Sequence, residues 1–400
     1  MHAAARVLQK CLSGVFSSMH VYRRDALLGA VCCLLSCRRL ILMDLARSWP
    51  GAERVRAPLK RLDRLLSNPH LAEEREALYG EMTRWLIRHP HPLILIDWSD
   101  LHADCRWQLL RASIPLNGRA VTVLEMVFPQ ALQGSPWAER RFLQRLRALL
   151  PEGIQPIVVT DAGFRAPWFR VLAQFGWCYV GRLRGRTRLQ IAEAPWFDQR
   201  ELHRQARSQA RRLQDVRMVQ TNPWRTDLVL YRKPRRGRVR RSVRTGLPSR
   251  DNANLKAQRR ESEPWLLVVS PELRHLAPRQ LVAIYAKRMQ IEESFRDLKC
   301  ARLGCAFNHS LTRDPRRIAI LLLIHALASF VAWLAALALE RSAQTRYGGV
   351  TSARLHRHYS QLRIGWEALR RQDASCTSLT LQAAFHRPPP DWLACLALPA

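Results

Sequence analysis

The chain has 400 residues, enough for two or three domains, and 48% of them are hydrophobic, which excludes a globally disordered protein. Lys and Arg number 65 against 32 Asp and Glu, a formal net charge of +33, and only six of the basic residues are lysine. Biased codon usage accounts for the arginine but not for the scarcity of acidic residues. A positive field of this size concentrates polyanions, so the charge favours a nucleic-acid-binding protein over a non-specific basic surface.

Residues 1–90 are expected to be helical. Short apolar helices are predicted over residues 26–37 and 40–47, and a turn at Pro50-Gly51 leads into a third over residues 55–66. Two short helices joined by such a turn favour a helix-turn-helix DNA-binding domain. The second helix of this helix-turn-helix, over residues 55–66, and the residue that precedes it carry a group of basic residues: Arg54, Arg56, Lys60, Arg61 and Arg64. This face either meets phosphates and base edges in a DNA groove or is a solvated basic surface.

Residues 91–184 have the pattern of a mixed-sheet α/β core. Residues 93–96 form an apolar run that ends in Asp97, and residues 157–160 form another that ends in Asp161. Between them lie a predicted hairpin, with strands over 107–114 and 120–128, and a helix over 137–150. A helix over 166–175 and a strand over 177–183 follow. Both aspartates are therefore expected at one rim of the sheet, where open α/β sheets place their sites.

Residues 185–263 do not continue the alternation of strands and helices. They contain short β-like segments, such as 227–231, and the arginine run at 235–241. We expect a β-rich basic insertion that carries a mobile loop. A strand over 265–270 and a long helix over 278–299 return to the core, whose second part ends near residue 340. Residues 341–400 are expected to form a helical C-terminal region with possible contacts between protomers.

Four polar residues share one face of the predicted helix over 278–299. At about 100° per residue, Tyr285, Arg288, Glu292 and Lys299 project from a stripe roughly 60° wide. In a purely structural interpretation, Arg288 and Glu292 form an i,i+4 ion pair. Alternatively, the carboxylate binds a divalent metal while the cations and the phenol hold phosphate oxygens.

The two strand-terminal aspartates favour the metal-binding interpretation. With Glu292, Asp97 and Asp161 make three acidic residues, which is enough to hold two divalent ions. Two such ions steer an in-line attack on a phosphodiester, and Mg²⁺ suits this chemistry because it leaves positions open for water and phosphate oxygens.

Three motifs carry a resemblance to a known family: Ile96-Asp97-Trp98-Ser99-Asp100, Thr160-Asp161-Ala162-Gly163-Phe164 and Tyr285…Arg288…Glu292…Lys299. The chain resembles the DDE transposases of bacterial insertion sequences, in the group with a Tyr-Arg-Glu-Lys signature. The resemblance covers nearly the whole chain, including residues 60–68 and 287–293.

The resemblance implies an RNase H-like core, in two parts over residues 91–184 and 264–340, around the insertion at 185–263. It implies cut-and-paste transposition by strand cleavage, hairpin formation and resolution, and strand transfer into target DNA. Asp97, Asp161 and Glu292 would hold two Mg²⁺ ions, for which Mn²⁺ substitutes. The implied partners are double-stranded DNA, as terminal inverted repeats and target, and a second copy of the chain in a synaptic complex. The expected location is the bacterial cytoplasm, at the nucleoid.

Further DNA contacts follow from the same resemblance. Tyr285, Arg288 and Lys299 would lie near the cleaved phosphate. Trp265 matches the family's stacking tryptophan, which would hold a flipped base, although a core tryptophan is the plain alternative. Met289 is a candidate wedge for the vacated stack. The competing function is a catalytically silent DNA-binding protein derived from a transposase.

Residues 318–339 form an apolar run that only His325 and Ser329 interrupt, and 22 residues are enough to span a bilayer. Arginines flank both ends, so the run has no inside–outside asymmetry. The run is either a membrane span or a buried core helix. The resemblance favours the second, because membrane insertion would place an arginine-rich active site at a lipid surface, so we predict a buried core helix and no membrane partner.

Overall fold

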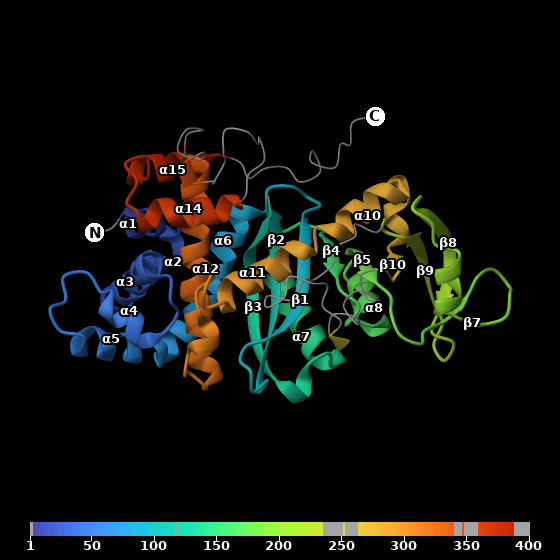
Figure 1. Cartoon of the computed structure of the whole chain (residues 1–400), viewed down its shortest axis with the longest axis horizontal. Coiled ribbons are helices and arrows are strands. Elements are labelled where there is room, and N and C mark those ends of the chain that lie inside the picture. Colours follow the sequence, from blue (N-terminus) through green and yellow to red (C-terminus); the bar gives the residue numbers. More distant parts are fainter. Residues whose placement is uncertain are drawn as a thin grey trace. The chain divides into compact units, whose positions relative to one another are not determined.

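The computed structural model describes residues 3–116, 118–234, 251–252, 263–339, 346–347 and 359–387, which form a mixed α/β protein (Figure 1). The chain divides into two compact units, Met1–Ile154 together with Met289–Cys395, and Gln155–Arg288. The expected basic loop at 235–241 lies outside the described residues, as do parts of the C-terminal region.

Helices alone make up the described chain as far as Leu86, as the sequence predicted for residues 1–90. Asn68 caps the last of them, because its side-chain oxygen accepts a hydrogen bond from the Leu71 amide at 3.0 Å and Pro69 follows at the first helical position. The six helices are α1 (Ala3–Cys11), α2 (Ser13–Ser18), α3 (Val21–Cys37), α4 (Leu42–Arg47), α5 (Arg56–Leu66) and α6 (Pro69–Leu86).

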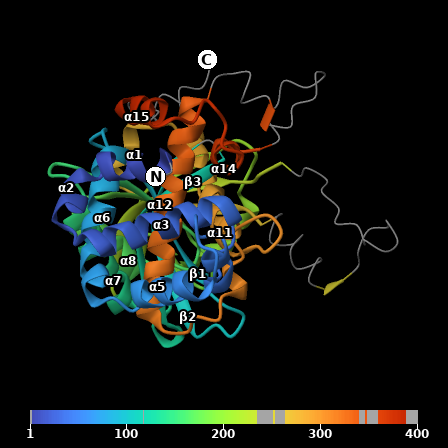
Figure 2. The ribbon, with the colours of Figure 1, turned by 90° about the vertical axis from the view of Figure 1, so that its left-hand side faces the viewer.

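Helix α12 (Pro315–Ala338) is the core of the first unit. Every residue from Ile318 to Ala336 is buried, and α12 contacts α3, α5, α6 and β3 as well as the C-terminal helices α14 (Gln361–Arg370) and α15 (Ser378–His386) (Figure 2). At Gly365 of α14 a Cβ atom would lie 1.7 Å from the Ala332 carbonyl oxygen, so only glycine permits this approach. Among the described helices α12 alone is long and apolar enough to cross a membrane, and its apolar stretch is fully buried, which confirms the predicted core helix.

Three antiparallel strands of the first unit lie in the order β3-β2-β1: β1 (Leu93–Asp100), β2 (Trp107–Leu116) and β3 (Arg119–Pro129). The predicted hairpin is confirmed as β2 and β3. The prediction that the first strand ends at Asp97 is wrong, because β1 pairs with β2 as far as Asp100, opposite Gln108. Helix α7 (Pro136–Leu149) packs on α6 and β3.

Seven strands of the second unit form a mixed sheet in the order β4-β5-β10-β9-β8-β6-β7, in which only β4 and β5 are parallel. Strand β4 ends at Thr160, so Asp161 follows it directly, as predicted. The strands of the expected insertion, β6 to β9, continue the sheet through β10. The elements are β4 (Ile157–Thr160), α8 (Ala166–Gln174), β5 (Cys178–Arg182), β6 (Arg188–Gln190), β7 (Phe197–Asp198), β8 (Arg211–Met218), β9 (Trp224–Tyr231) and β10 (Trp265–Val269).

The long helix predicted over residues 278–299 is broken. The structure has α10 (Pro278–Ala286) and α11 (Met289–Lys299), and the amides of Lys287 and Arg288 bond to carbonyls three residues back, at 3.1 and 3.0 Å. The prediction of one continuous helix is therefore wrong, and with it the single stripe of four polar residues. The division between the two units falls at the same point, immediately after Arg288.

Candidate active site

The first unit contributes Asp97, Glu292 and Lys299. Asp97 lies inside β1, is 7% exposed, and accepts a hydrogen bond from the Trp98 amide at 2.9 Å. Helix α11 packs against β1 and places Glu292, half-buried, in its first turn. At the other end of α11 the Lys299 ammonium donates to Ser99 Oγ at 2.8 Å and to the Asp100 carbonyl at 3.1 Å. Burial lowers the pKa of Lys299, and the nearby charge of Asp100 opposes this shift.

A buried charged network lies beside Asp97. In register across the sheet, Asp97 is opposite Arg111 of β2, and Arg111 is opposite Glu125 of β3. The Arg111 Nε–H donates to Glu125 at 2.6 Å, the Tyr79 hydroxyl donates to the other carboxylate oxygen at 2.8 Å, and neither charged side chain is more than 1% exposed. Arg111 also lies 4.7 Å from the centroid of the Phe295 ring, so the network reaches α11.

The sequence analysis did not single out this network. Arg111 is the one charged residue in the predicted strand over 107–114, and Glu125 is the one charged residue in the predicted strand over 120–128. A single charge in a mostly apolar strand was the available signal.

Helix α11 is fixed on β3 through side chains other than Glu292. Ser294 Oγ accepts from the Ala120 amide at 2.9 Å and donates to the Ala120 carbonyl at 3.0 Å. The Arg119 guanidinium binds both carboxylate oxygens of Asp297, and it also lies 3.7 Å from a carboxylate oxygen of Glu293. Glu293 of α11 thus pairs with Arg119 of β3.

The second unit contributes Asp161, Tyr285 and Arg288. Asp161 is half-buried, and one of its carboxylate oxygens accepts from the Gly163 amide at 2.7 Å. Tyr285 is buried, which raises its pKa, while the charges of Arg288 and Arg182 lower it and that of Asp161 raises it. All of these groups therefore lie within electrostatic reach of one phenol.

Trp265, at the start of β10, is half-buried beside this group. Its ring contacts Tyr285 edge-on, with centroids 4.9 Å apart, and Tyr231 at 5.8 Å. Trp265 therefore packs against Tyr285 and stays partly accessible to solvent. Met289, at the start of α11 in the first unit, is 51% exposed.

The predicted basic face of the N-terminal region is present. Arg54, Arg56, Lys60, Arg61 and Arg64 are all exposed, while Leu62, Leu65 and Leu66 of α5 are buried. The Arg61 guanidinium lies 5.2 Å from the centroid of the Trp49 ring. Exposure is common to both interpretations of this face, so its role in DNA binding stays a prediction.

The donor set suits a hard divalent cation, because Asp97, Asp161 and Glu292 offer only carboxylate oxygens. In both aspartates a backbone amide fixes one carboxylate oxygen. Within the described ranges, no group of three or more His, Cys, Asp or Glu side chains is arranged to hold a metal ion. The metal site therefore stays a prediction.

The model of the transposase DDE domain family matches residues 88–331, well over half of the chain. The chain belongs to this family. Its DDE domain includes Asp97, Asp161 and Glu292, and also the buried pair Arg111 and Glu125. Helices α1 to α6, α14 and α15 lie outside the matched residues.

One solved structure similar to this DDE transposase is the cryo-EM structure of the piggyBac transposase synaptic complex with hairpin DNA. The similarity has a TM-score of 0.44 and 12% sequence identity, and it covers 95% of this chain and 76% of the other. Among curated protein sequences there is no match.

Proposed function

We propose that this DDE transposase moves a bacterial insertion sequence by cut-and-paste transposition. It cleaves the strands at the ends of the element, forms and resolves hairpins there, and joins the freed 3′ ends to target DNA. The observation that carries the proposal is the family match over residues 88–331, because it contains all three acidic residues of the motif. The proposed catalytic core is RNase H-like.

Asp97, Asp161 and Glu292 are the proposed ligands of two divalent ions, Mg²⁺ with Mn²⁺ as a substitute. When bound, such ions stabilise the charge that develops at the attacked phosphorus and lower the pKa of the attacking water. The backbone bonds to Asp97 and Asp161 support this role, since they orient both carboxylates before any ion binds.

Lys299, Arg288 and Tyr285 are the proposed contacts to the cleaved strand. The Lys299 ammonium uses two of its three N–H groups on Ser99 and Asp100 within the described structure, and the third suits a phosphate oxygen. Arg288 lies 5.9 Å from the centroid of the Tyr285 ring, which orients its planar guanidinium.

Trp265 and Met289 are the proposed contacts to bases. Hairpin formation bends DNA sharply, and a flipped base relieves the crowding at a cost of a few kcal/mol. Stacking on Trp265 contributes about 1–3 kcal/mol toward that cost. Met289, half-exposed at the start of α11, is the proposed wedge between the remaining bases.

The proposed partners are the terminal inverted repeats, the target DNA and a second copy of the chain, because two ends must be held together for excision. The basic face of α5 is proposed to bind the repeat, and no membrane partner is proposed. The proposed location is the bacterial cytoplasm, at the nucleoid.

The test is cleavage of a duplex that carries the repeats flanking the coding sequence. In Mg²⁺, Asp97→Asn, Asp161→Asn and Glu292→Gln should each lower the cleavage rate by about 1,000-fold or more. Glu293→Gln is the matched control, since it removes a neighbouring carboxylate that pairs with Arg119, and it should stay within about threefold of the wild type.

Cleavage by Asp97→Asn at the wild-type rate would reject the assignment of the acidic residues. Wild-type protein that binds the duplex but does not cleave it in Mg²⁺ or Mn²⁺ would instead support the catalytically silent DNA-binding protein.

A further inference from the structure

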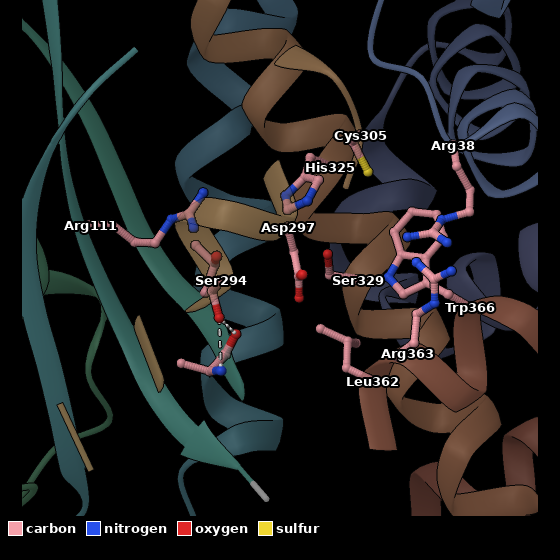
Figure 3. A pocket seen from close by; sticks show the side chains of 12 residues that line it. Arg38, Arg111, Ser294, Asp297, Cys305, His325, Ser329, Leu362, Arg363 and Trp366 are labelled. Atoms are coloured by element: carbon pink, nitrogen blue, oxygen red, sulfur yellow. Dashed lines mark hydrogen bonds between the residues drawn. The ribbon is translucent and has the colours of Figure 1, made fainter. Parts of the chain in front are cut away.

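Two arginines from distant parts of the first unit converge on the loop that follows α11. Arg38 directly follows α3, and its guanidinium donates to the Leu303 carbonyl at 3.0 Å. Arg363 of α14 donates to the same carbonyl, also at 3.0 Å. Figure 3 shows both side chains extending beside the ring of Trp366. Two cations therefore share a single neutral acceptor.

Neither arginine has an ion-pair partner among the described residues. The acids whose charges reach Arg38 are Glu367 and Asp297, and both are engaged elsewhere. Glu367 pairs with Arg370 at 2.5 Å and with Arg371 at 3.0 Å. Asp297 is bound through both oxygens by Arg119. The Arg38–Arg363 pair thus lies close together without an ion pair of its own among the described residues, an arrangement that a bound anion would stabilise.

The pair also has hydrogen-bond donors to spare. A guanidinium has five N–H donors, and the bond to Leu303 uses one from each arginine. The Trp366 ring, 5% exposed, lies with its centroid 5.7 Å from the Arg38 guanidinium carbon and holds its plane.

Arg38 and Arg363 are both half-buried, so a phosphate would reach their remaining N–H groups from solvent. Planar, forked donors match phosphate oxygens better than a single ammonium does. The cavity behind the pair, lined also by His325 and Ser329, has a volume of about 20 Å³. That volume admits a water molecule but not a phosphate group.

We propose that Arg38 and Arg363 form a clamp for a backbone phosphate of duplex DNA. The identity of the anion rests on the proposed function, since a DNA transposase meets no polyanion more often than its substrate. The clamped loop begins at Cys300, directly after Lys299, so a bound phosphate would also restrain the end of α11. The contact is to the backbone and is independent of sequence.

The test compares two double variants that each remove two positive charges. Arg38→Ala with Arg363→Ala removes the clamp. Arg370→Ala with Arg371→Ala, at the end of the helix that carries Arg363, removes two arginines that are paired with Glu367. Binding of a mixed-sequence 40-base-pair duplex is measured by fluorescence anisotropy over a range of salt concentrations. The clamp variant should bind about tenfold more weakly and reduce the salt slope by about 1, and the control should keep the wild-type slope.

Further measurements separate the alternatives. Arg38→Lys with Arg363→Lys keeps the charge but removes the fork, so it should bind between wild type and the alanine variant. A clamp variant with a lowered melting temperature but the wild-type salt slope would overturn the proposal, because the arginines would then only cap the Leu303 carbonyl. Binding of inorganic phosphate that depends on the pair, with duplex binding unchanged, would overturn the DNA assignment. If the wild-type protein binds the duplex through the two arginines but does not cleave DNA, the proposed function is wrong and the phosphate clamp is still supported.

Discussion

Asp97 and Asp161 are the same residue type in the same motif, yet the two units hold them in different ways. Asp97 lies within a paired strand, is 7% exposed, and is next to a fully buried ion pair. Asp161 follows a strand, is half-buried, and is oriented by the Gly163 amide in its own turn. The first carboxylate therefore depends on the core of its unit, and the second depends on local backbone geometry.

The cationic residues differ in the same sense. Lys299 is bonded to the strand that carries Asp97. In the second unit the corresponding group consists of arginines around a buried phenol, with Trp265 at its edge. Variants of core residues should thus lower the stability of the first unit most. Variants of aromatic residues should act on the second unit, and variants of exposed basic residues should act on DNA binding.

The largest effect is expected for Arg111→Met. It leaves the Glu125 carboxylate buried without its cation, which should lower the free energy of unfolding by about 3–5 kcal/mol in urea denaturation. The matched change in the second unit is Arg182→Met, whose partner Glu263 lies at 3.1 Å and is partly exposed. It should cost about 1 kcal/mol or less.

A double variant that replaces both Arg111 and Glu125 tests whether the unpaired buried charge causes this loss of stability. Arg111→Met with Glu125→Gln should recover part of the stability, because no unpaired charge is then buried. If Arg111→Met costs no more than Arg182→Met, the contrast between the two units is wrong.

A smaller effect is expected for Trp265→Ala, which should change the rate of a catalytic step. Removing about 1–3 kcal/mol of stacking should slow hairpin formation by about 5- to 150-fold and leave the first strand cleavage less affected. Trp265→Phe keeps an aromatic face and should retain most of the rate. Equal slowing of both steps by both variants would point to a core tryptophan.

Acidification should destabilise the first unit through His325 of α12. Burial lowers the pKa of His325 from its ordinary value of 6.5 to about 3. Between these pH values the unfolded chain binds a proton that the folded chain does not, so stability falls as the pH falls below 6.5. From pH 7 to pH 5 the decrease should be about 2 kcal/mol, measured by urea denaturation at each pH.

The control for this pH effect is His325→Asn, which should lack that share of the pH dependence. His203→Asn, in the second unit, replaces a half-buried histidine and should change the profile less. An unchanged profile in His325→Asn would contradict the role assigned to the buried imidazole.

The smallest effect is expected on the exposed face of α5. Lys60→Ala with Arg64→Ala should weaken duplex binding and reduce the salt slope by about 1 for each phosphate that is no longer neutralised, with no change in stability. Salt-dependent anisotropy is the measurement. A wild-type slope would identify this face as solvated basic surface.

Much of the fold could be predicted from the sequence, because local patterns determine it. The hairpin and strand β4 with Asp161 after it followed from periodicity and turn residues, whereas the choice of a buried helix for α12 over a membrane span followed from the family resemblance. The break between α10 and α11 could not be predicted, since neither Gly nor Pro occurs there and the local pattern is compatible with a helix.

The pairing of strands across the sheet also could not be predicted from the sequence. Strand β1 continues past Asp97 because β2 supplies hydrogen-bond partners as far as Asp100. The contact of Arg111 with Glu125 likewise needs the register of three strands. The candidate acids were found through a motif, whereas the residues that support them depend on tertiary structure.

The most direct test of the central claim is protein cleavage by Fe²⁺ bound in place of Mg²⁺. With ascorbate and peroxide, hydroxyl radicals formed at the ion cut the nearby backbone, and mass spectrometry locates the cuts. A shared metal site predicts cuts in β1 near Asp97, after β4 near Asp161 and in α11 near Glu292, all suppressed by excess Mg²⁺ and by Asp161→Asn. Cuts confined to other segments, or unchanged in Asp161→Asn, would contradict it.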